Sequence, residues 1–96
     1  MLTTSPAPLR GAVLGCGMIA AQHLRGWARI PEVSIVALCD VDRAVAEQRR
    51  TELAPDARVF TSLDELLATE RIDFIDILTP PAVHAAHVRA AAAADL

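Results

Sequence analysis

The sequence predicts an α/β domain in which a parallel β-sheet carries helices on both faces. Short apolar segments alternate with longer segments of helical periodicity, and the connections between them are short. Strands that alternate with helices in this way form parallel pairs through right-handed crossovers. A glycine-rich turn also joins the first predicted strand to the first predicted helix. At 96 residues, the chain has room for one such domain.

The first half of the chain predicts two strand–helix pairs. Residues 9–14 are an apolar segment that runs into a glycine, which indicates a strand. Residues 18–30 place apolar side chains at helical spacing, and Pro31 ends this predicted helix. Residues 33–39 are almost continuously apolar, as is typical of a strand buried on both faces. Residues 42–54 follow as a helix with a polar face.

The second half repeats the pattern twice. Residues 58–60 predict a short strand, and residues 63–69 predict a short helix with Ser62 as its N-cap. Residues 72–78 predict a fourth strand, and residues 81–94 predict an alanine-rich helix. The expected strand order is 3-2-1-4, with two further strands needed to complete a six-stranded sheet. The sequence therefore predicts an incomplete Rossmann-type sheet of about four strands over residues 9–96.

Composition excludes several classes of protein. The hydrophobic fraction of 53% is too high for a disordered chain, and no apolar run is long enough to span a membrane. A net charge of −3 and few aromatic side chains argue against a nucleic-acid partner. Residues 1–8 lack the features of a secretion signal, so we expect a disordered tail there. Cys16 and Cys39 indicate reduced thiols, which favours a cytoplasmic location.

The glycine-rich turn has the pattern G-x-G-x-x-A, from Gly15 to Ala20. Gly15 allows a tight turn from strand to helix, and Gly17 lets a pyrophosphate approach the backbone. Ala20 is small enough for the helix to pack closely on the strand. The free N–H groups at the helix start attract phosphate oxygens. We therefore expect this turn to bind a dinucleotide.

Asp40 lies at the end of the second predicted strand, which faces the adenosine ribose in this fold. A carboxylate there accepts hydrogen bonds from the ribose hydroxyls and repels a 2′-phosphate, which favours NAD over NADP. Arg43 could instead accept that phosphate if its side chain turns inward. A second reading makes Asp40 a helix cap, although Asp42 suits that task better.

The Thr79-Pro80-Pro81 turn follows the fourth predicted strand and borders the crevice where ligands bind in this fold. His84 is one turn into the next helix, where it could reach the cofactor, whereas we expect His87 to be solvated. Asp76 is unusual, because it interrupts an apolar strand and needs a hydrogen-bond partner that the sequence does not identify.

The sequence resembles the N-terminal domain of the glucose–fructose oxidoreductase and inositol dehydrogenase (Gfo/Idh/MocA) family. The resemblance rests on the glycine loop followed by His23, on Asp40 within CDVDRA, on TSLDELL, and on IDFIDILTPPAVH. It implies hydride transfer between NAD or NADP and a sugar, polyol or related CH–OH group. It also implies a set of cofactor-lining residues: Gly15, Cys16, Gly17, Met18, Ile19, Asp40, Thr79, Pro80 and His84.

The chain departs from the family beyond its last helix. In the family, a strand ending in Glu-Lys-Pro follows, its lysine assists proton transfer, and a C-terminal sheet domain forms the substrate pocket. This chain ends at Leu96 and contains no lysine. We therefore expect a fragment that binds the cofactor, has no catalytic residue of its own and is inactive alone. An uncovered fourth strand would favour a homo-oligomer.

Three alternatives remain open at this point. A non-catalytic NAD-binding module has the same cofactor residues. An S-adenosylmethionine-dependent methyltransferase shares the start of the glycine loop, but Ile19 stands where its third glycine is usual. A structural α/β domain would bind no ligand. We expect no metal site, because His84 and His87 lack a third ligand.

Overall fold

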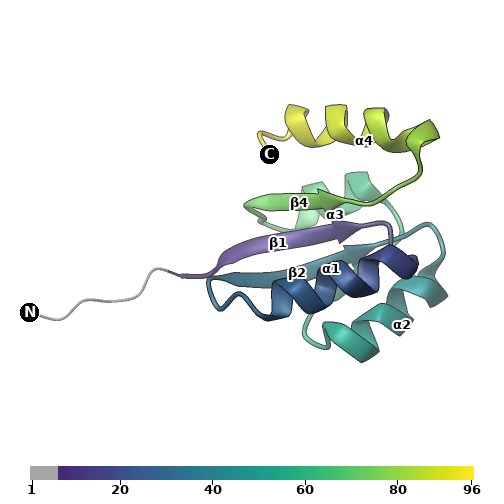
Figure 1. The fold of residues 1–96 in the computed structure, drawn as a ribbon. Helices are drawn as coiled ribbons and strands as arrows, with labels where there is room; N and C mark the ends of the chain where they lie inside the picture. Colours follow the sequence, from purple (N-terminus) through teal and green to yellow (C-terminus); the bar gives the residue numbers. More distant parts are fainter. Residues whose placement is uncertain (1–6) are drawn as a thin grey trace, which may run out of the picture.

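The computed structural model describes residues 7–96, so most of the predicted tail lies outside the described residues. Strands and helices alternate along the described chain, as predicted (Figure 1). Their order and bounds are β1 (Leu9–Leu14), α1 (Met18–Ala28), β2 (Val33–Cys39), α2 (Arg43–Leu53), β3 (Arg58–Phe60), α3 (Leu63–Thr69), β4 (Phe74–Ile77) and α4 (Pro81–Ala93).

The four strands form one sheet in the order β3-β2-β1-β4. Every neighbouring pair is parallel. In Figure 1, α1 and α2 lie on one side of the sheet and α3 lies on the other. The predicted fold class, strand order and placement of helices are therefore confirmed. No helix in the described part of the chain is both long and apolar enough to cross a membrane.

Six element ends differ by one or two residues from the prediction, namely the ends of α1 and α4 and both ends of α2 and of β4. Helix α1 ends at Ala28, because the N–H groups of Arg29 and Ile30 turn back to carbonyls within the last turn ahead of Pro31. Strand β4 begins at Phe74. Asp73, the residue before it, contacts Arg10 of β1 in two ways: its backbone N–H donates to the Arg10 carbonyl, and its side chain accepts the Arg10 N–H. Helix α4 ends at Ala93, one residue before the predicted end.

Each face of the sheet buries its own apolar cluster. Successive side chains of a strand point to opposite faces, so Val13 faces α1 and α2 while Leu14 faces α3. Leu24 of α1 and Leu66 of α3 are large buried side chains of the two clusters. The carboxyl-terminal halves of β1 and β2 are thus buried on both sides, between the two apolar clusters.

Strand β4 is held to the rest of the domain by aromatic packing and by one carboxylate. The Phe74 ring lies over Gly11 of β1, where any Cβ would overlap it. The ring centroids of Phe74 and Trp27 are 4.9 Å apart. Asp76 accepts hydrogen bonds from the Trp27 indole at 2.9 Å and pairs with Nδ1 of His23 at 2.7 Å. The partner that the sequence could not identify for Asp76 is therefore a pair of side chains on α1.

Candidate functional site

The glycine loop joins β1 to α1 and requires glycine at its first position. Gly15 has a φ of +93°, a left-handed conformation that residues with a Cβ rarely adopt. A Cβ on Gly15 would also lie 2.9 Å from the carbonyl oxygen of Leu78. The chain therefore turns tightly there and passes directly beside the end of β4, as the sequence predicted.

Gly17 leaves the start of α1 open. It is the N-cap residue of α1, no side chain caps this helix end, and a Cβ on Gly17 would meet nothing within 4 Å. Met18 and Ile19, the next two residues, are exposed. The first backbone N–H groups of α1 are thus accessible to an anionic group, and the helix dipole favours one at this position.

Asp40 connects the glycine loop to the end of β2. Its Oδ2 accepts the Cys16 N–H at 2.8 Å, and its Oδ1 accepts the Asp42 N–H at 2.9 Å. Asp42, rather than Asp40, caps α2 by accepting the Ala44 N–H at 3.0 Å. Because each carboxylate oxygen accepts about two hydrogen bonds, Asp40 still has acceptor capacity toward a ligand.

A pocket of about 370 Å³ lies at the carboxyl ends of the strands. It brings together four of the predicted site residues, namely Gly15, Asp40, Thr79 and Pro80. In an open parallel sheet, ligands bind in a crevice at this edge, where the strand order reverses. The full set of lining residues is Leu14, Gly15, Cys39, Asp40, Val41, Thr61, Leu63, Thr79, Pro80, Val83 and His87.

The other predicted site residues do not line this pocket. Cys16, Gly17, Met18 and Ile19 lie next to it, at the start of α1. The ring of His84 is turned to β4, with Nε2 at 3.3 Å from the Ile77 carbonyl oxygen.

His87 lines the pocket instead, and its Nδ1 lies 2.8 Å from Oγ1 of Thr79. The sequence placed His87 in solvent, yet it is half-buried. The available signal was its spacing: residues three apart on a helix share a face, so a helix that turns His84 to the sheet also turns His87 there.

The two thiols beside the site are held in their protonated form. Burial, and then the negative charge of Asp40, raise the pKa of Cys16 to about 12. The same two causes raise the pKa of Cys39 to about 11. Since the thiolate is the reactive form, neither residue can act as a nucleophile near neutral pH. Among the described residues, no cluster of side chains could hold a metal ion.

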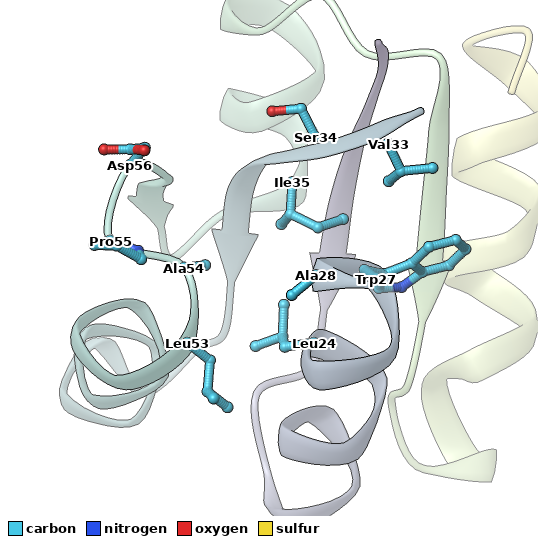
Figure 2. A pocket seen from close by; sticks show the side chains of 10 residues that line it. All are labelled: Leu24, Trp27, Ala28, Val33, Ser34, Ile35, Leu53, Ala54, Pro55 and Asp56. Atoms are coloured by element: carbon cyan, nitrogen blue, oxygen red, sulfur yellow. The ribbon is translucent and has the colours of Figure 1, made fainter. Parts of the chain in front are cut away.

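A smaller pocket lies at the opposite ends of the strands, between the last turns of α1 and α2 (Figure 2). Its volume is about 130 Å³, and Leu24, Trp27, Ile35 and Leu53 make most of its wall apolar. None of the predicted cofactor residues lines it. This pocket is smaller and lies away from the glycine loop. The larger pocket, which Gly15 lines, is therefore the candidate site.

Together, the parallel sheet, the glycine loop and the strand-end acid define a dinucleotide-binding domain. Residues 9–96 match the family model described as "Oxidoreductase family, NAD-binding Rossmann fold" (Gfo/Idh/MocA). The chain therefore belongs to this family, as its motifs indicated. Membership in this NAD-binding family removes the methyltransferase alternative and argues against a structural α/β domain that binds no ligand.

Individual relatives agree with this assignment. The chain is 35% identical to a D-apiose dehydrogenase of Paraburkholderia graminis over 96 residues, which covers 96% of this chain and 24% of that enzyme. It is 39% identical to an inositol 2-dehydrogenase of Agrobacterium fabrum over 90 residues, covering 90% of this chain and 26% of that enzyme. The chain thus spans about a quarter of the length of these curated relatives.

Solved structures show the same fold. An oxidoreductase from Agrobacterium radiobacter, in complex with NAD⁺, L-tartaric acid and magnesium, superposes with a TM-score of 0.88 at 30% identity, covering 94% of this chain and 26% of that one. A myo-inositol 2-dehydrogenase from Lactobacillus plantarum superposes with a TM-score of 0.83 at 32% identity, covering 93% and 26% of the two chains.

Proposed function

We propose that this domain binds NAD in the pocket at the carboxyl ends of β1, β2 and β4. The observation that carries the proposal is that the open start of α1 at Gly17 lies beside the carboxylate of Asp40. Cys16, the residue before Gly17, donates its N–H to that carboxylate and so fixes the two groups next to each other. In this arrangement the free backbone N–H groups of Gly17, Met18 and Ile19 hold the pyrophosphate. Gly15 and Cys16 shape the turn, because their N–H groups already donate to the Cys39 carbonyl and to the Asp40 carboxylate.

Asp40 is the proposed ribose ligand. Its remaining lone pairs accept hydrogen bonds from the adenosine ribose hydroxyls, while its charge repels the 2′-phosphate of NADP. Arg43 could offset that repulsion, but it is an exposed residue in the first turn of α2 and is not among those that line the pocket. NAD is therefore the proposed cofactor in preference to NADP.

The end of β4 is the proposed contact for the nicotinamide half. Thr79 and Pro80 line the pocket on the side of β1 away from Asp40. Only the family resemblance supports His84 as a contact to the cofactor, because its ring lies against the Ile77 carbonyl oxygen here. When bound, NAD supplies the hydride acceptor or donor, and these residues bind and orient it.

We further propose that the domain serves an oxidoreductase acting on a CH–OH group of a sugar or polyol. The names of the curated relatives support this substrate class, and the share of their length that the chain spans supports further protein beyond the domain. The proton-transferring lysine and the substrate pocket would then lie outside these residues. Two buried thiols without a disulfide support a cytoplasmic location.

Calorimetric titration of the protein with three nucleotides tests the cofactor assignment. NAD⁺ is expected to bind at least about fivefold more tightly than NADP⁺, since a like charge beside Asp40 costs on the order of 1 kcal/mol or more. S-adenosylmethionine is expected to give no binding heat. Tighter binding of NADP⁺ would overturn the role given to Asp40, and absence of NAD⁺ binding would overturn the proposed function.

A further inference from the structure

The pocket carries one hydrogen-bonded pair that the proposed function leaves unexplained. Nδ1 of His87 on α4 lies 2.8 Å from Oγ1 of Thr79, at the end of β4. Both side chains are half-buried, and both line the pocket with Gly15.

The surroundings of this pair make its donors important. No lysine or arginine lines the pocket, and the charged side chain among its lining residues is the carboxylate of Asp40. The donors that the lining itself offers to a dinucleotide are therefore neutral, while the guanidinium of Arg49 lies outside the lining, with Nε donating to the Gly17 carbonyl oxygen at 3.3 Å. Apart from backbone N–H groups, the strong donors in the lining are the hydroxyls of Thr61 and Thr79 and the ring of His87.

The direction of the His87–Thr79 hydrogen bond decides what Thr79 offers a ligand. If the Thr79 hydroxyl donates to Nδ1, only its acceptor lone pairs face the pocket. If the N–H at Nδ1 donates to Oγ1, the hydroxyl hydrogen is free to point into the pocket. Phosphate and ribose ring oxygens accept hydrogen bonds and cannot donate them. The second arrangement is therefore the one that lets Thr79 bind these acceptor oxygens of a dinucleotide.

We propose that His87 is a positioning residue: its Nδ1–H donates to Thr79 and turns the Thr79 hydroxyl toward an acceptor oxygen in the nicotinamide half of the bound dinucleotide. This inference rests on the proposed binding of NAD. It assigns to α4 a role in the affinity of the site, in addition to packing against the edge strand β4.

A double-mutant cycle tests this proposal by calorimetry. His87→Leu and Thr79→Val are each expected to weaken NAD⁺ binding about fivefold, the effect of losing one hydrogen bond. Because both changes remove the same contact, the double variant is expected to bind no more than about fivefold more weakly than the unmodified protein. His87→Asn, which keeps an amide donor near the position of Nδ1, is expected to recover most of the affinity.

Two controls locate the effect. AMP lacks the nicotinamide half, so its affinity is expected to be the same in all these variants. His23→Leu makes the same chemical change on α1, where His23 pairs with Asp76 on the opposite face of the sheet. This variant is expected to bind NAD⁺ as the unmodified protein does.

The outcomes separate this inference from the proposed function. If the unmodified protein fails to bind NAD⁺, both are wrong. If it binds NAD⁺ and His87→Leu binds NAD⁺ equally well, the role of His87 is refuted and the proposed function stands. The same holds if the two single losses of affinity multiply in the double variant. Should His87→Leu fail to fold, ¹⁵N spectra of the His87 ring in the unmodified protein with NAD⁺ decide: a protonated Nδ1 supports the proposal and a bare Nδ1 overturns it.

Discussion

Replacing Gly17 with alanine separates cofactor binding from folding at the glycine loop. The φ of Gly17 is −70° and its ψ is −160°, which alanine adopts freely, and the new methyl group would meet nothing within 4 Å. Losing the N-cap glycine lowers the free energy of unfolding by about 0.5–1 kcal/mol. The lower conformational entropy of the unfolded chain raises it by a similar amount. The free energy of unfolding of Gly17→Ala is therefore expected to stay within about 0.5 kcal/mol of its original value.

The same methyl group occupies the space through which a pyrophosphate reaches the start of α1. A phosphate kept at van der Waals distance from a methyl loses at least one hydrogen bond to a backbone N–H. Hydrogen bonds to a charged group contribute about 1.5–3 kcal/mol each. NAD⁺ is therefore expected to bind roughly ten- to hundredfold more weakly to Gly17→Ala.

Gly26→Ala is the matched control for this prediction. Gly26 lies within α1, and its added methyl would also meet nothing within 4 Å. Alanine in a helix interior stabilises by about 1 kcal/mol relative to glycine, so this variant is expected to melt higher and to bind NAD⁺ unchanged. Calorimetric titration and thermal melting measure both quantities. Unchanged NAD⁺ affinity in Gly17→Ala would refute the placement of the pyrophosphate at this helix start.

Four further predictions concern stability and reactivity. Gly15→Ala is expected to destabilise the fold by about 1–3 kcal/mol in urea melts, since it combines a positive φ with a close backbone contact, and stability equal to that of the unmodified protein would contradict this. Asp76→Ala leaves the half-buried Trp27 N–H without its acceptor and is expected to cost about 1–3 kcal/mol by the same assay. A loss below about 0.5 kcal/mol would show that the pairing adds little. Burial raises the pKa values of Cys16 and Cys39 to about 12 and about 11, so both thiols are expected to resist iodoacetamide at pH 8 until urea unfolds the chain. Because unfolded thiols lose their protons at lower pH than these folded ones, stability is expected to fall as the pH rises above about 9, and a stability that is flat or rising between pH 9 and 11 would oppose this assignment.

Local features of the sequence predicted the fold well, because each element carries its own signal. The apolar run of β2 indicates a strand buried on two faces, and the glycine pattern indicates a tight turn into a helix. Ser62 accepts the Glu65 N–H and caps α3, as its spacing predicted. Such signals involve neighbouring residues, so they can be read without knowledge of the tertiary structure.

Contacts between distant residues could not be predicted in the same way. The partners of Asp76 are 53 and 49 residues away on α1, and nothing local to β4 identifies them. The bonds from Asp40 to the glycine loop and from His87 to Thr79 depend on how two elements pack. Sequence reasoning therefore named four of the eleven residues that line the pocket, did not foresee the hydrogen bond that joins Asp40 to the glycine loop, and assigned His87 to solvent.

Binding of NAD at the glycine loop is the central claim, and backbone amide NMR during a titration with NAD⁺ tests it most directly. The largest shifts are expected at Gly17, Met18 and Ile19, with smaller ones at Asp40 and Thr79 around the larger pocket. Shifts confined to the pocket in Figure 2, near Leu24 and its neighbours, would place the ligand at the wrong end of the sheet and contradict the claim. Absence of any shift at millimolar NAD⁺ would contradict it as well.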